Sequence, residues 1–172
     1  MLTLLKISQF TLVETMELDI SRGFTVITGE TGAGKSIILD ALGLCLGDKA
    51  DAQVVRHGAD KAELVAMFDI SRHKEAQEWL AERDLDDSQD CSLRRVIHKE
   101  GRSKAWINGS PVSLGELRSL GELLISIHSQ HAHQSLLKKD SHRQLIDNVG
   151  ALQPLALEVA ALYHTWQQCQ QA

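Results

Sequence analysis

A glycine-rich segment between residues 29 and 36 has the residue types and the spacing that bind phosphate groups. It fits the pattern of Gly, any four residues, Gly, Lys and then Ser or Thr. Glycines in such a loop let successive backbone N–H groups converge on anionic oxygens. The Lys35 ammonium would reach the β- and γ-phosphates of a nucleotide, and the Ser36 hydroxyl would be a ligand of Mg²⁺. The candidate phosphate loop consists of Gly29, Glu30, Thr31, Gly32, Ala33, Gly34, Lys35 and Ser36.

Hydrolysis of a bound nucleotide needs further groups that hold Mg²⁺ and orient water. Asp69 ends the apolar run from Leu64, so its carboxylate is one candidate, although a half-buried strand whose Asp69 faces water is the simpler interpretation. Gln130 follows the apolar run Leu123–Ile127, and its amide oxygen would reach the metal or a water. On the pattern alone, Gln130 is equally well interpreted as a solvated loop residue.

Two further clusters of side chains, one of histidines and one of basic residues, are candidates for binding a metal ion and DNA. A histidine cluster suggests a metal site, but no Cys or acidic residue completes the ligand set, so solvated loop histidines are the simpler reading. Its members are His128, His131 and His133. A basic cluster suggests DNA contact, with a solvated sheet face as the commoner explanation. Its members are Arg94, Arg95, His98, Lys99, Arg102 and Lys104.

Hydrophobic periodicity predicts the elements that position these groups. We expect a strand before the phosphate loop, at Phe24–Thr28, and a helix after it, at Ser36–Leu46. Two antiparallel strands are predicted before this unit, within Leu2–Ile20. The elements predicted after it are a strand at Lys61–Ile70, a short helix opening at Ser71, a hairpin of Cys91–Lys99 and Arg102–Ile107, and a tight turn at Asn108-Gly109.

The C-terminal third is predicted to be mostly helical. Ser113 and Glu116 form a capping box that begins a helix reaching about Leu120, and Leu123–Ile127 reads as a buried strand. A short helix is expected over Ser141–Asn148, and another begins near Pro154. The apolar residues of the last helix are spaced alternately three and four residues apart, which is typical of a coiled coil. The alternative interpretation is a surface helix that packs on its own domain. These apolar residues are Leu152, Leu155, Val159, Leu162, Trp166 and Cys169.

The composition restricts the class of protein. The chain has 172 residues and a formal net charge of −5, so it is one domain's worth of chain without the basic excess of a typical nucleic-acid binder. Three cysteines without a Cys-x-x-Cys pair argue against a disulfide framework or a zinc ribbon and fit a reducing, cytoplasmic setting. Because no run of about eighteen apolar residues occurs, we expect neither a signal peptide nor a membrane-spanning segment.

Three stretches of the chain are distinctive when taken together, namely Val26–Gly47, Gly101–Val112 and Leu120–Leu137. They resemble the N-terminal part of the RecN family, the SMC-like DNA-repair ATPases of bacteria. The resemblance implies an α/β fold, a P-loop NTPase of the ABC/SMC head type. Its N-terminal lobe combines an antiparallel β-sheet with a P-loop βα core. Residues 1–150 would be the N-terminal half of this head, and residues 151–172 the start of a coiled-coil arm.

The resemblance also implies roles for single residues. Gln130 corresponds to the Gln of the family's Q-loop, which contacts Mg²⁺ and senses the γ-phosphate, and Asp69 to an ordinary residue of the lobe. Two positions depart from the family, which commonly has Gly where this chain has Ser129 and Arg where it has Lys49, although Arg56 stands nearby. The family's signature motif, Walker B Asp, catalytic Glu and switch His follow the coiled coil. We therefore expect a fragment or a split head with no catalytic residue of its own.

These observations lead to one favoured hypothesis and two competitors. The favoured one is an ATP- and Mg²⁺-binding head segment that acts in repair of DNA double-strand breaks, in the cytoplasm and at the nucleoid. Its implied partners are the C-terminal half of the same head, a second head in a homodimer, and DNA through the full-length assembly. The runner-up is a self-contained small P-loop kinase or NTPase that uses Asp69 as its Mg²⁺ ligand. The third is a non-enzymatic interaction module with a structural phosphate loop.

Overall fold

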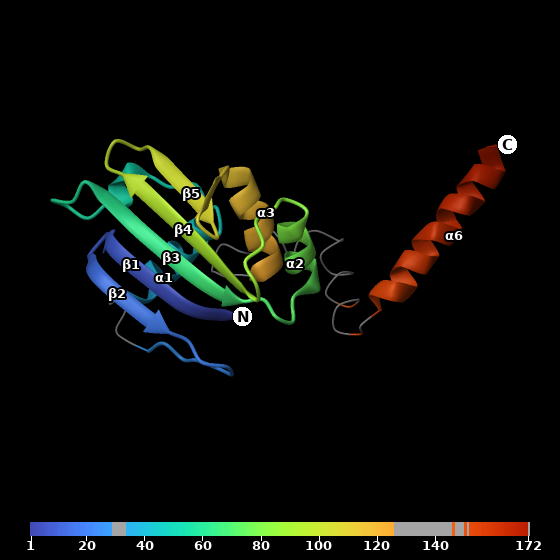
Figure 1. Cartoon of the computed structure of the whole chain (residues 1–172), viewed down its shortest axis with the longest axis horizontal. Coiled ribbons are helices and arrows are strands. Elements are labelled where there is room, and N and C mark those ends of the chain that lie inside the picture. Colours follow the sequence, from blue (N-terminus) through green and yellow to red (C-terminus); the bar gives the residue numbers. More distant parts are fainter. Residues whose placement is uncertain (29–33, 126–145, 147–149, 151, 172) are drawn as a thin grey trace. The chain divides into compact units, whose positions relative to one another are not determined.

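The structure is a computed structural model of the whole chain (Figure 1). It describes residues 1–28, 34–125, 146, 150 and 152–171. The chain divides into two units, Met1–Ile127 and His128–Ala172. The first unit carries the sheet and the helices that pack on it, and the second carries one long helix.

The first unit is built on a six-stranded sheet in the order β2-β1-β3-β4-β5-β6. All neighbouring strands are antiparallel. The strands are β1 (Leu2–Phe10), β2 (Val13–Asp19), β3 (Lys61–Asp69), β4 (Asp90–His98), β5 (Ser103–Ile107) and β6 (Ser110–Val112). The two edges of the sheet, among the described residues, are therefore β2 and β6.

Strict alternation along β3 shows why one face of the sheet is buried. Ala62, Leu64, Ala66 and Phe68 are all fully buried, while the residues between them are partly exposed. Successive side chains of a strand point to opposite faces, so these four residues form one apolar stripe. The stripe packs with the apolar residues of the neighbouring strands and of the helices into one core.

Within the described residues, three helices and a short 3₁₀ helix accompany the sheet. They are α1 (Lys35–Cys45), η1 (Ala52–Val54), α2 (Lys74–Ala81) and α3 (Leu114–Leu124). Helix α1 packs on β1, β3 and β4 and lies behind the sheet in Figure 1. Helix α3 contacts both β5 and α2. The core therefore lies between the sheet and this helical layer.

Most of the predicted elements are confirmed. The strands within Leu2–Ile20, the strand at Lys61–Ile70 and the hairpin of Cys91–Lys99 with Arg102–Ile107 form as antiparallel pairs of the sheet. The capping box is present, because the Ser113 hydroxyl accepts from the Glu116 amide and the Glu116 carboxylate accepts from the Ser113 amide. The helix predicted to open at Ser71 begins three residues later, at Lys74.

One predicted strand is wrong, and a second is wrong in part. Residues 24–28 are not a strand, and all of them are exposed, with Phe24 at 95%. Backbone of this kind needs a partner strand for its N–H and C=O groups, and no strand of the described chain pairs with it. The predicted strand Leu123–Ile127 is wrong at Leu123 and Leu124, which belong to α3, whereas Ile125 has extended backbone and residues 126 and 127 lie outside the described residues. The buried residues Leu117, Leu120 and Leu124 have helical spacing and share one face.

The second unit contains helix α6 (Gln153–Gln171), with Pro154 in its first turn as predicted. The helix expected over Ser141–Asn148 lies almost wholly outside the described residues. None of the described helices is both long and apolar enough to cross a membrane.

Candidate functional site

The C-terminal residues of the phosphate loop begin helix α1. Gly34 is the N-cap residue with φ 93° and ψ −3°, in the left-handed region that residues with a Cβ rarely adopt. Its carbonyl oxygen accepts from the Ile38 amide at 3.3 Å, which closes the first turn. Lys35 and Ser36 are therefore the first two residues of the helix, in the order that the motif requires. Gly29, Glu30, Thr31, Gly32 and Ala33 lie outside the described residues.

The start of α1 suits a phosphate group. Gly34 has no side chain to accept from the first-turn amides, and the first turn contains no acidic residue. Helices usually satisfy these amides with a side-chain oxygen or an anion, and the positive end of the helix dipole favours negative charge there. The residues present thus fit an anionic group such as the phosphates of a nucleotide.

The C-terminal end of α1 is held tightly against α3. Gly47 has φ 99°, and a Cβ on it would lie 2.8 Å from backbone atoms of Arg118. A Cβ on Gly121 would lie 2.7 Å from the Leu46 carbonyl oxygen. The two glycines allow α3 to approach the end of α1 more closely than any other residue type would. The helix that carries Lys35 and Ser36 is thereby fixed at its far end.

Asp69 has structural partners that account for its charge. Its carboxylate accepts from Arg22 Nη2 at 3.1 Å and from the Ser71 amide at 3.0 Å. Hydrogen bonds from Ser71 and Arg22 hold the pKa of this carboxyl well below its ordinary value of 3.8. Its carbonyl oxygen accepts from the N-terminal ammonium of Met1. The contacts therefore make Asp69 a structural residue at the end of β3, and the alternative in which it binds Mg²⁺ is not favoured.

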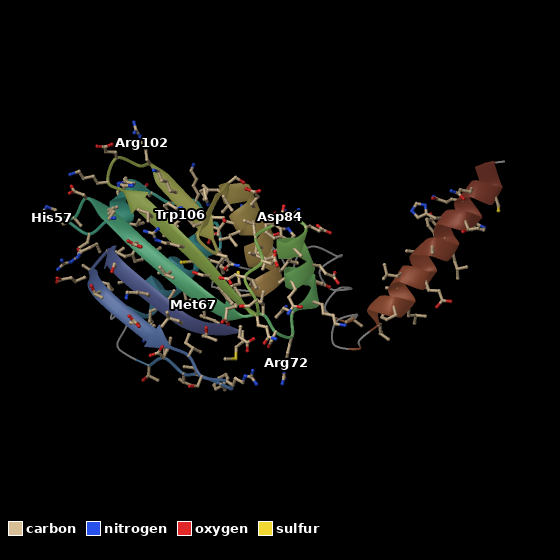
Figure 2. All side chains as sticks on the ribbon, in the orientation of Figure 1. His57, Met67, Arg72, Asp84, Arg102 and Trp106 are labelled. Carbon is tan, nitrogen blue, oxygen red and sulfur yellow. The ribbon has the colours of Figure 1, made fainter. Side chains whose placement is uncertain are left out.

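Half of the basic cluster of the hairpin is engaged in contacts within the protein. Arg94 Nε donates to Glu63 at 2.7 Å, and its guanidinium lies 4.6 Å above the ring of Trp106, a residue of the sheet that is labelled in Figure 2. Lys99 pairs with Asp60, and this contact lowers the pKa of Asp60 and raises that of Lys99. Arg95 is fully buried. Half of the six predicted DNA-contacting cations thus have other partners, which favours the solvated sheet face.

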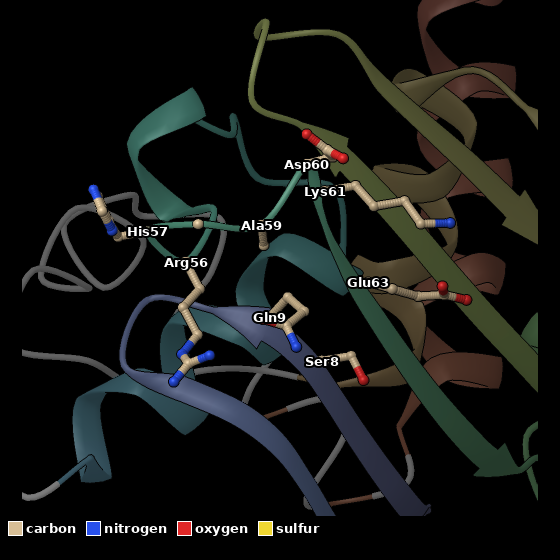
Figure 3. Close-up of a pocket in the computed structure, with 9 residues that line it drawn as sticks. Ser8, Gln9, Arg56, His57, Ala59, Asp60, Lys61 and Glu63 are labelled. Carbon is tan, nitrogen blue, oxygen red and sulfur yellow. The ribbon is translucent and has the colours of Figure 1, made fainter.

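A surface cavity of about 650 Å³ lies beside Arg56 (Figure 3). The Arg56 amide donates to Gln9 O at 2.9 Å, and its guanidinium pairs with Glu14 at 3.6 Å. The other lining residues are Ser8, Gln9, His57, Gly58, Ala59, Asp60, Lys61 and Glu63. Two basic and two acidic side chains balance each other here, so the cavity has no charge that selects an anion.

The other candidate ligands fall outside the described residues. These are Gln130, Ser129 and the cluster of His128, His131 and His133. Among the residues that the structure describes, no three His, Cys, Asp or Glu side chains are grouped to hold a metal ion. The roles of Gln130 in binding Mg²⁺ and of the histidines therefore stay predictions.

Comparison with known proteins assigns the chain to a domain family. A family model described as "AAA domain" matches residues 2–153. The chain is 48% identical over 168 residues to the protein named DNA repair protein RecN of Vibrio cholerae, and 38% identical over 169 residues to that of Bacillus subtilis. Each alignment covers 98% of this chain, but only 30% and 28% of the two relatives. The chain thus spans about a third of the length of these relatives.

Solved structures share the fold at low sequence identity. An Smc head domain with a coiled coil and joint, derived from Pyrococcus yayanosii, has a TM-score of 0.67 at 22% identity. The match covers 91% of this chain and 33% of that one. A structure titled for ATP-driven dimerization and DNA stimulated activation of SMC ATPases has a TM-score of 0.63 at 22% identity, covering 86% of this chain and 98% of that one. The fold is therefore the N-terminal lobe of a head of the ABC/SMC type.

Proposed function

The chain belongs to the AAA domain family, and from this premise we propose that it is the ATP-binding, N-terminal head segment of a RecN-like DNA repair protein. The observation that carries the proposal is the start of α1. Left-handed Gly34 leads into Lys35 and Ser36 at a helix N-terminus without an acidic residue or a side-chain cap. The similarity to proteins named DNA repair protein RecN, over nearly the whole chain, supports the cellular role.

In this proposal each residue of the phosphate loop has a stated task. Backbone N–H groups of Gly29–Gly34 and of the first turn of α1 surround the phosphate oxygens. The Lys35 ammonium neutralises the β- and γ-phosphates, and the Ser36 hydroxyl and the Gln130 amide oxygen are ligands of Mg²⁺. The metal would polarise the γ-phosphate and neutralise the charge that develops on it.

The C-terminal half of the same head is the first partner that we propose. The segment 24–28 leads into the phosphate loop and pairs with no strand of the described chain, and Phe24, Val26 and Ile27 expose 95%, 65% and 49% of their surface. A strand from the rest of the head would pair with this backbone and cover these side chains. Leu39 on α1, 47% exposed, would be covered by the same partner.

The remaining partners belong to the whole protein. We propose that two complete heads form a homodimer around ATP, and that DNA binds through the full-length assembly, in recombinational repair of double-strand breaks. A solved structure with a similar fold has a title that names ATP-driven dimerization and DNA stimulated activation of SMC ATPases. This similarity supports both a second head and DNA as partners. A cytoplasmic, nucleoid-associated location follows from this role.

The chain alone should bind nucleotide weakly and turn it over negligibly. By the family resemblance, the general base, the Walker B Asp and the signature loop are in the C-terminal part, which this chain does not include. ATPase turnover of the chain should therefore be measured alone and after adding the separately expressed C-terminal half of Vibrio cholerae RecN.

Turnover only in the mixture, abolished by Lys35→Ala in this chain, is the expected result. A Lys74→Ala variant, which changes an exposed lysine at the start of α2, controls for the loss of one positive charge. Robust turnover by the chain alone that disappears on Asp69→Ala would overturn the proposal in favour of a self-contained kinase or NTPase.

A further inference from the structure

Arg95 is the one charged side chain that is fully buried among the described residues. It lies on β4, opposite Leu64 of β3 and Ala105 of β5. Because it alternates with Leu93 and Ile97, its side chain points to the core face, where α1 packs. A guanidinium in an apolar core is costly unless its N–H groups find acceptors.

The acceptors of Arg95 are at the C-terminal end of α1. Nη1 donates to the Leu44 carbonyl oxygen at 3.1 Å and to the Asp48 carbonyl oxygen at 3.2 Å. Nη2 donates to Ser103 Oγ at 3.2 Å, which orients the guanidinium from β5. The positive charge also complements the negative end of the α1 dipole. Its Nε has no partner, so the side chain is held by its two terminal nitrogens.

The burial of residues along α1 indicates that its C-terminal end determines the position of the helix. Residues 41–47 are buried, whereas Ser36, Leu39 and Asp40 are exposed. Toward the phosphate loop Ile37 and Ile38 are half-buried against the core, so the helix is held most firmly near Leu44. A rotation at the fixed end moves Lys35 and Ser36, because an α-helix of this length behaves as a rigid rod.

We propose that Arg95 is a positioning residue for the nucleotide site, acting through α1. The inference rests on the proposed binding of ATP at the phosphate loop. The guanidinium sets the place of the α1 C-terminus relative to β4 and β5, and thereby the place of Lys35 and Ser36 relative to the phosphates. A hydrophobic residue would fill the same volume without the desolvation cost, but it would not specify where the carbonyl groups of α1 lie.

The test compares Arg95→Met, Arg95→Lys and Ser103→Ala with a matched control, Val96→Ala. Val96 is the next residue of β4, is also buried, and points to the opposite face of the sheet, away from α1. Binding of a fluorescent ATP analogue with Mg²⁺ is measured at a temperature where every variant is folded. Hydrogen exchange of the α1 amides is measured without nucleotide, and each melting temperature is recorded.

The expected result separates positioning from general stability. Arg95→Met should raise the Kd for the nucleotide about tenfold, since misplacement by about 1 Å is enough for such losses. Arg95→Lys should restore part of the affinity and Ser103→Ala should lose part of it. Val96→Ala should change Kd less than about twofold while it lowers the melting temperature. The α1 amides should exchange faster in Arg95→Met than in Val96→Ala.

Two results would overturn the inference. One is an unchanged Kd in folded Arg95→Met; the other is a loss of affinity in Val96→Ala that equals the loss in the Arg95 variants. If Arg95→Met does not fold, Arg95→Lys and Ser103→Ala decide the same question. A wild-type chain that binds no nucleotide, or that binds it equally well after Lys35→Ala, refutes the phosphate site itself and is thereby distinguished from a failure of Arg95 alone.

Discussion

Arg22 and Asp69 are joined by an ion pair in which Nη2 lies 3.1 Å from Oδ2. Arg22 precedes the segment that leads into the phosphate loop, and Asp69 ends β3. The pair therefore connects the approach to the loop with the sheet, 47 residues further along the chain. It gives Asp69 a structural role in place of the metal-binding role that its sequence position suggested.

Replacement of Asp69 by Asn tests this role through pH. The folded-state pKa of Asp69 is lowered, so its stabilising contribution is complete above about pH 5 and is lost as the pH falls below the ordinary value of 3.8. The Asn variant should unfold more readily than wild type at pH 7, and this difference should shrink steadily as the pH falls below about 4. Urea unfolding at a series of pH values measures the difference.

The same variant also separates the structural role from metal binding. Affinity for the Mg²⁺–nucleotide complex should change less than about twofold, because surface ion pairs contribute little to a distant site. A large loss of Mg²⁺-dependent affinity, with stability unchanged, would instead identify Asp69 as a metal ligand.

Gly47→Ala should destabilise the fold much more than Gly101→Ala. Both glycines have positive φ, 99° and 84°, so Ala is strained at either position by about 1 kcal/mol. Only at Gly47 does the added Cβ meet backbone atoms, those of Arg118 at 2.8 Å, whereas nothing lies within 4 Å at Gly101. Overpacking should add about 1–3 kcal/mol at Gly47. Equal losses in chemical denaturation of the two variants would show that α1 and α3 separate without cost.

Helices and strands that are determined by residues close together in the sequence could be predicted from it. In β3, Ala62, Leu64, Ala66 and Phe68 alternate as one buried face demands. Ser113 and Glu116 form their capping box from residues three positions apart, with no help from the rest of the chain. Such patterns predicted five of the described strands and the beginnings of α1, α3 and α6 closely, because the information lies within a few neighbouring residues; α2 begins three residues later than predicted.

Features that depend on distant partners were not predictable in this way. Phe24–Thr28 has the composition of a strand, but a strand requires a paired neighbour, and the described chain provides none. Arg95 was grouped with five surface cations because sequence order does not reveal which face of β4 lies under α1. The one signal in the sequence that Arg95 is buried was its place between Leu93 and Ile97, because every second residue of a strand points to the same face.

Charge reversal on the β4–β5 hairpin tests whether its remaining cations contact DNA. Arg102 lies at the hairpin turn (Figure 2), and Lys104 lies on β5; among the described residues neither side chain forms an ion pair. Because their neighbours Arg94 and Lys99 are already paired with Glu63 and Asp60, we expect only a weak basic patch. The double variant Arg102→Glu, Lys104→Glu should change duplex DNA affinity less than about twofold at about 0.15 M salt. A marked loss with a smaller salt dependence would assign DNA contact to the hairpin.

Helix α6 supports a prediction about its exposed apolar residues. Leu155, Val159, Leu162 and Trp166 are each more than half exposed, and their spacing of three and four residues places them along one side of the helix. Leu157 is 72% exposed and lies on nearly the opposite side, by the 100° rotation per residue of an α-helix. The helix therefore carries its own control position, a leucine of similar exposure outside the proposed seam.

Leu162→Glu should weaken association with the C-terminal half of a RecN relative, and Leu157→Glu should not. Burial of one leucine contributes about 1.5–3 kcal/mol, and a buried unpaired carboxylate costs more, so the association constant should fall at least about tenfold. Sedimentation of the mixed halves measures the constant, and quenching or enhancement of Trp166 fluorescence reports whether the seam itself is covered. If both variants weaken association equally, the partner surrounds α6 without using a seam; if neither does, α6 is a surface helix, and a coiled-coil arm does not begin here.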